Sequence, residues 1–241
     1  MANPQHLKIL SEQGVPAWNI WRLENVGLVP DLKNADLSGG QWKGVDLRNA
    51  DLTGAILREA DLRGAALTEA RLAGAVLSDA DLSGAVLSGA DLSQADLKRA
   101  KLRSTDMRKT RLTNADLSEA DLSRSALLQS DVSGSSMQHA ALQKANLTSA
   151  RLCRTNLQGA VLDDAKLMWA DLTDADLRNA SLQGASLDEG VLANACLQDA
   201  DLKAAQFQEA DLSNANLRGA RLKDAKLGDA RMAGTKLPHV E

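Results

Sequence analysis

Large apolar residues recur at every fifth position over most of the chain. They begin at Leu32 and end at Leu237, and 36 of the 42 positions with this spacing are leucine. The position two residues earlier is small and most often alanine, as in the stretch Ala80-Asp81-Leu82-Ser83-Gly84. Each pentad therefore has two apolar positions, and the residues between and after them are mostly polar.

A period of five does not fit the two common secondary structures. On an α-helix, five residues turn the chain by about 500°, so successive leucines would spread over every face. On a flat strand, an odd period would place them on alternating faces. A chain that turns a corner every five residues keeps all of them inside. Successive coils would then stack at the strand spacing of about 4.8 Å, and their backbone groups would pair.

These residues resemble the pentapeptide-repeat family, whose consensus is Ala-(Asp/Asn)-Leu-x-x. The resemblance covers residues 30–237 without an insertion. It implies an all-β fold, a right-handed quadrilateral parallel β-helix with four pentads per coil, which agrees with the usual handedness of parallel β connections. We therefore expect residues 30–241 to form a solenoid of about ten coils and about 50 Å in length.

Residues 1–29 lie outside the repeat and are expected to form a helical capping segment. Asn3-Pro4 has the form of an N-cap followed by proline at the first helical position, and Gly14 is placed to end this helix. A second helical stretch is predicted over residues 17–25. This leader resembles one that precedes the repeats in many bacterial members of the family.

Aromatic residues of the leader are candidates for covering the first coil. Both ends of a solenoid need protection, so we expect Trp18, Ile20 and Trp21 to pack on the first coil near Trp42. The alternative is an aromatic ligand pocket, which is less favoured because a cap has to exist in any case.

Composition and charge restrict the function. The net charge is −4 and aromatic residues make up 2% of the chain. Summed over residues 30–239, the four predicted faces carry −1, −2, +2 and −2, which favours neither direct nucleic-acid binding nor an acidic mimic. We find no signal peptide and no apolar run long enough for a membrane helix, and we expect a cytoplasmic protein without membrane contact.

The sequence contains no pattern typical of catalysis. The histidines His6, His139 and His239 lack metal-ligand spacing, and Cys153 and Cys196 are too few for a disulfide framework. There is no glycine-rich phosphate loop, and an unbroken repeat has no loops that could wall a pocket. We therefore predict no enzyme activity, no cofactor and no metal.

One group of apolar residues departs from the polar pattern. Leu128, Met168 and Trp169 follow inward leucines of the face centred on Leu127, Leu147 and Leu167, so they should point outward. They form a candidate protein-contact patch. The alternative is that they are scattered surface apolar residues, which are common on any protein.

The pattern predicts a non-catalytic scaffold that binds an unidentified protein partner through one face, as a monomer or a weak end-to-end dimer. The resemblance implies an alternative, because some members of the family bind DNA gyrase by imitating DNA and so protect it from gyrase poisons. Those members typically have a loop projecting from a coil and a C-terminal dimer contact, and neither is expected here.

Overall fold

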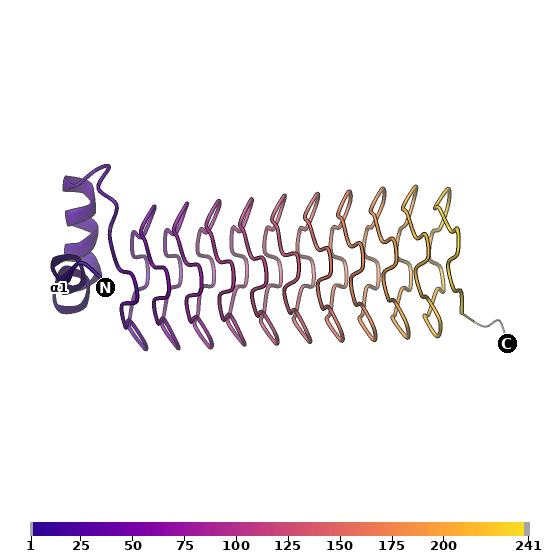
Figure 1. Cartoon of the computed structure of the whole chain (residues 1–241), viewed down its shortest axis with the longest axis horizontal. Helices are drawn as coiled ribbons and strands as arrows, with labels where there is room; N and C mark the ends of the chain where they lie inside the picture. The colour runs from indigo at the N-terminus through magenta and orange to yellow at the C-terminus, as the bar shows by residue number, and fades with distance from the viewer. Residues whose placement is uncertain (1, 239–241) are drawn as a thin grey trace.

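The structure, a computed structural model, describes residues 2–238, which form a straight rod of stacked coils with one helical element at its N-terminal end (Figure 1). Helix α1 spans Pro4–Glu24 and is kinked at Gly14, whose backbone has φ 80° and ψ 179°. The side chain of Asn3 accepts hydrogen bonds from the amides of Gln5 and His6, and Pro4 occupies the first turn. The predicted cap, with its break at Gly14, is confirmed.

Backbone pairing in the rod joins residues that are 20 apart. The bridges are parallel and run from Asp31↔Asp51 to Asn216↔Lys236, each with a single bridging residue per pentad instead of an extended strand. The amide of Leu32 donates to the carbonyl oxygen of Asp51, and the amide of Asp51 donates to that of Pro30, both at 2.8 Å. Twenty residues per coil correspond to four pentads, as predicted.

A tight turn makes each corner of the coil. At the first corner, the amide of Ala35 donates a 3.1 Å hydrogen bond to the carbonyl oxygen of Leu32, and Asn34 between them has φ 54°. Every fifth residue from 34 to 234 has a positive φ, as the third residue of a type II turn requires. Many of these corner residues are not glycine, a feature of the corner that the sequence analysis did not anticipate.

The core is a continuous stack of inward side chains. The large inward residues from Leu47 to Leu217, among them Leu147 and Phe207, are almost completely buried, whereas Leu237 in the last coil is 52% exposed. Hydroxyl groups occupy some of the small inward positions in the middle of the rod. The predicted solenoid domain ends with residues 239–241, which include His239 and lie outside the described residues.

Candidate protein-contact surface

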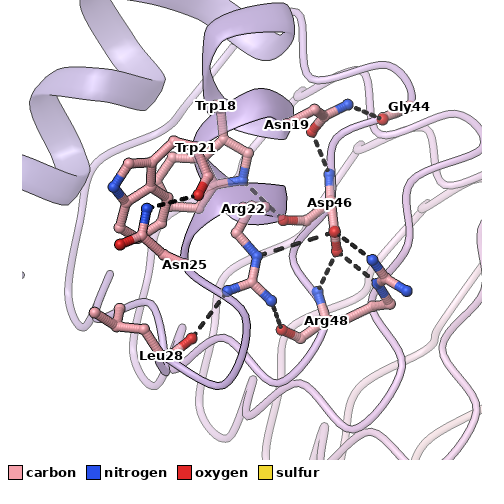
Figure 2. Close-up of polar contacts among 9 residues, drawn as sticks. All are labelled: Trp18, Asn19, Trp21, Arg22, Asn25, Leu28, Gly44, Asp46 and Arg48. Atoms are coloured by element: carbon pink, nitrogen blue, oxygen red, sulfur yellow. Dashed lines mark hydrogen bonds and ion pairs between the residues drawn. The ribbon is translucent and has the colours of Figure 1, made fainter.

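The aromatic residues of the cap pack on the first coil through Trp18. This side chain is fully buried, and its Nε1 donates a 2.8 Å hydrogen bond to the carbonyl oxygen of Asp46 (Figure 2). Trp21 lies beside it, with ring centroids 5.0 Å apart. Trp42 is half-buried, and its Nε1 donates to the carbonyl oxygen of Leu37 at 3.0 Å. These three residues therefore serve the end of the core, and no ligand is needed to explain them.

Ile20 does not join this cluster. Its side chain is 58% exposed, because two residues along an α-helix place it roughly 200° away from Trp18. The expectation that Ile20 covers the first coil is therefore wrong. The kink at Gly14 divides α1 into a first arm before it and a second arm after it, which contains Trp18 and Ile20. The apolar residues of the second arm occupy two sides of the helix, and only one of these sides faces the coil.

Polar contacts that the sequence analysis missed also fix the cap (Figure 2). The side chain of Asn19 donates to the carbonyl oxygen of Gly44 at 3.0 Å and accepts from the amide of Asp46 at 2.9 Å. The guanidinium of Arg22 donates to the carbonyl oxygens of Leu28 and Arg48, at 3.0 and 2.8 Å. Because these bonds need backbone groups of the first coil and of the segment before it to be in place, no sequence pattern of the leader reveals them.

The residues of the predicted contact patch point outward. Leu127 and Leu167 are fully buried, whereas Leu128 and Met168 are half-buried and Trp169 is 51% exposed. We call the side of the rod built by the pentads of Leu127, Leu147 and Leu167 the Leu127 face. The structure thus brings all three candidate residues to one edge of this face.

Stacking of the coils sets the spacing within the patch. The amide of Gln129 donates to the carbonyl oxygen of Thr148 at 3.1 Å, and the amide of Ser149 donates to that of Met168 at 2.9 Å. Leu128 and Met168 are therefore two coils apart, or roughly 10 Å along the rod. They line two separate shallow grooves, of about 530 Å³ at Leu128 and about 310 Å³ at Met168.

Trp169 occupies a corner position with a left-handed backbone. Its φ is 57°, and every other non-glycine residue at the corners is polar, charged or alanine. A bulky side chain is disfavoured in this conformation, because its Cβ approaches the following carbonyl oxygen. About half of Trp169 is in solvent, so it contributes less buried apolar surface to the fold than an inward residue does.

Acidic residues continue the same edge beyond Trp169. The amide of Trp169 donates to the carbonyl oxygen of Asp188 at 3.1 Å, and Glu189 and Glu209 follow at the next two corners. The carboxylate of Asp188 accepts from the amide of Gln208 at 2.9 Å and from the hydroxyl of Ser186 at 3.1 Å. Within residues 2–238, neither Glu189 nor Glu209 has an ion-pair partner, so this end of the patch is negative.

Some other acidic residues of the rod form ion pairs with arginine. Asp61 pairs with Arg63 at 2.5 Å, and the hydrogen bonds from Arg63 lower the pKa of Asp61 to about 2. The same aspartate-x-arginine pairing occurs at Asp106 and Arg108. Glu189 and Glu209 lack such an ion pair among residues 2–238, as do other glutamates of the rod such as Glu59 and Glu119, so their carboxylates are free to meet a partner.

The described part of the chain offers little for catalysis. Burial raises the pKa of the Cys153 thiol to about 11, so it stays protonated at neutral pH. Residues 2–238 include no group of three or more histidine, cysteine, aspartate or glutamate side chains that could hold a metal ion. Within the same residues, the structure has no helix of the length and hydrophobicity that crossing a bilayer requires.

Comparison with known proteins supports the repeat and the fold. The family described as "Pentapeptide repeats" matches eight copies, within ranges that run from residue 31 to residue 237. No curated protein matches the chain.

The solved structures that are similar to this chain include HetL and QnrB1. HetL is a pentapeptide repeat protein involved in heterocyst differentiation regulation from the cyanobacterium Nostoc sp. strain PCC 7120. It is 36% identical with a TM-score of 0.53, and the match covers 90% of this chain and 94% of HetL. QnrB1 is a plasmid-mediated fluoroquinolone resistance protein, which is 20% identical with a TM-score of 0.58 over 78% of this chain and 90% of QnrB1. The right-handed quadrilateral β-helix expected from the sequence is confirmed.

Proposed function

Because this chain belongs to the pentapeptide-repeat family, we propose that it is a non-catalytic scaffold that binds another protein through the Leu127 face. Proteins of this family generally act as structural or interaction proteins. HetL is involved in the regulation of heterocyst differentiation, which shows that a rod of this kind can take part in regulation.

The observation that carries the proposal is the position of Trp169. It is 51% exposed and has φ 57°, at a corner where a bulky residue strains the backbone. Exposed tryptophans are enriched among the residues that dominate protein interfaces. A residue that costs the fold energy and faces solvent is best explained by a contact outside the chain.

The neighbours of Trp169 suggest the chemistry of the partner. Met168 adds apolar surface to a groove that it lines together with Asp188, Glu189 and Glu209. Their three negative charges exceed the one positive charge of Lys226 in the same groove. A partner segment that combines an apolar side chain with lysine or arginine would complement both. The surface of Leu128, Met168 and Trp169 is small, and a stable interface needs roughly 800 Å² per partner. Neighbouring outward residues of the Leu127 face must therefore contribute as well.

The test is a binding comparison with a matched control. Trp169→Gly removes the side chain at a position where glycine is favoured, and Asn179→Gly makes the same backbone change on another face, where φ is 58°. A partner isolated from host lysate with the wild-type rod is purified, and its affinity for the three proteins is measured. We expect Trp169→Gly to weaken binding at least tenfold and Asn179→Gly to leave it unchanged.

Salt dependence separates the apolar and the charged contributions. Replacing Glu189 and Glu209 with glutamine should weaken binding at low salt and reduce its dependence on ionic strength. If the affinity of every recovered partner is the same for wild type and Trp169→Gly, the Leu127 face is not the contact surface and the proposal fails.

A further inference from the structure

The outer surface of the cap exposes an unusual amount of apolar side chain. Ten large hydrophobic residues of the described chain are exposed, and five of them fall between residues 20 and 29. These five, which we call the cap patch, are Ile20 at 58%, Leu23 at 71%, Val26 at 87%, Leu28 at 42% and Val29 at 54%. The other exposed hydrophobic residues are spread along the rod.

Geometry explains why these side chains cannot reach the core. In the second arm of α1, Trp18 faces the first coil, and Ile20 lies on the opposite side of the helix. Leu23 is three residues after Ile20 and therefore lies beside it. A helix with apolar residues on two sides is normally covered on both, and here the coil covers only one.

The cap patch is held in a fixed shape. Arg22 donates to the carbonyl oxygen of Leu28 at 3.0 Å and to that of Arg48 at 2.8 Å, which ties the segment after α1 to the first coil (Figure 2). The amide of Leu28 also donates to the carbonyl oxygen of Asn25 at 3.1 Å. A partner therefore meets preformed apolar surface, and binding requires little further ordering.

The size and charge of the cap patch indicate which kind of partner it can bind. The exposed fractions add up to about three aliphatic side chains, on the order of 500 Å² of surface, which is in the range of the largest apolar patch of a monomer, and such patches are often functional. Two such patches bury about 1,000 Å², the lower limit for a specific dimer. The charges of residues 1–33 balance, with Lys8, Arg22 and Lys33 against Glu12, Glu24 and Asp31. A surface helix that binds lipid needs an excess of lysine and arginine, so a membrane does not fit.

We infer that the cap patch binds the cap patch of a second copy of this chain, so that two rods join at their N-terminal ends around a twofold axis. An isologous contact covers both patches and closes at two chains, whereas a head-to-tail contact would continue into a filament. The dimer leaves the Leu127 face free, so it does not depend on the proposed partner.

Sedimentation equilibrium of the full chain over a wide range of concentration tests the dimer. The variant with both Ile20→Gln and Leu23→Gln removes two members of the cap patch. The control carries Val86→Gln and Val191→Gln, which are 38% and 37% exposed on the rod. We expect the dimer dissociation constant to rise at least tenfold in the cap variant and to change less than twofold in the control, with unchanged circular dichroism for both.

A crosslink and a shape measurement identify the contact. In a chain with Cys153→Ser and Cys196→Ser, Leu23→Cys should form a disulfide-linked dimer under oxidation, and small-angle scattering should show a particle about twice as long as the monomer. A wild-type chain that stays monomeric up to about 1 mM overturns the inference. So does a dimer that the cap variant does not weaken, or association that continues into longer polymers.

Discussion

The amide of Asp31 donates a 3.0 Å hydrogen bond to Nδ1 of His6, which joins the first arm of α1 to the first coil of the rod. Nδ1 can accept this bond only while it carries no proton. His6 is buried, with 8% of its surface exposed, and its ring lies 4.9 Å from that of Trp21. Burial lowers the pKa of His6, while the nearby Asp31 acts in the opposite direction.

The docking of the cap should therefore depend on pH. Since the pKa of docked His6 lies below the ordinary value of 6.5, the undocked state binds the proton more tightly. The stabilisation is complete above about pH 6.5 and declines as the pH falls from there through the pKa of the docked state. We expect the fluorescence of Trp18 and Trp21 to shift between pH 7.5 and 5. His6→Asn keeps an acceptor for the Asp31 amide and should lose this step, whereas an identical step in both proteins would contradict the role of His6.

The inward stack should tolerate no charge. Leu147 is fully buried, and a carboxylate there would have neither water nor a partner. We expect Leu147→Asp to cost more than about 4 kcal/mol, or to abolish folding, in chemical denaturation. Ser149→Asp, two residues away at a corner, is the control and should change stability by less than about 0.5 kcal/mol. Near-native stability of Leu147→Asp would mean that this position does not face the core.

Two buried serines make a matched pair inside the rod. The hydroxyl of Ser130 donates to the carbonyl oxygen of Leu127 at 2.7 Å, whereas the hydroxyl of Ser135 is buried without a partner among the described residues. Removing an unsatisfied buried hydroxyl should help, and removing a bonded one should not. We expect Ser135→Ala to gain and Ser130→Ala to lose about 1 kcal/mol, measured as opposite shifts of the denaturation midpoint. Equal shifts would show that the two hydroxyls have the same environment.

Much of the rod follows from the spacing of Leu and Ala alone. Only a chain that turns a corner every five residues keeps residues such as Leu147 on the inside. The sequence analysis therefore identified the coil, the inward residues and the outward direction of Trp169. It could not separate Ser130 from Ser135, because both occupy the small position of a pentad and differ only in the carbonyl groups that surround them.

The orientation of α1 on the first coil could not be predicted from the sequence. Trp18 and Ile20 are both apolar residues of one short helix, and which side meets the coil depends on how α1 bends at Gly14. The leader has no repeat that fixes its orientation, so Ile20 was assigned to the covered side. A signal was present in the sequence: Ile20 and Leu23 form an apolar pair three residues apart, on a side of the helix away from Trp18.

DNA gyrase should not respond to this protein. The bridges continue in steps of 20 residues from Asp31 to Lys236, without a projecting loop, and the four faces sum to charges between −2 and +2. A DNA duplex of about 50 Å carries on the order of 30 phosphate charges, so the rod is a poor electrostatic imitation. In a supercoiling assay with a quinolone, we expect no protection at concentrations equal to that of gyrase. Clear protection would favour the gyrase-binding alternative over the proposed scaffold function.

The backbone at Trp169 permits a test that separates contact from stability. Its φ of 57° disfavours any side chain, so Trp169→Gly should be more stable than Trp169→Ala by about 1 kcal/mol, although both lose the same indole. Relative to wild type, we expect Trp169→Gly to unfold at the same or a slightly higher denaturant concentration. Both variants should lose partner binding to the same extent, because binding depends on the side chain and the difference in stability depends on the backbone. If Trp169→Gly is instead less stable than wild type by more than about 1 kcal/mol, the indole supports the fold and is no longer evidence for a partner.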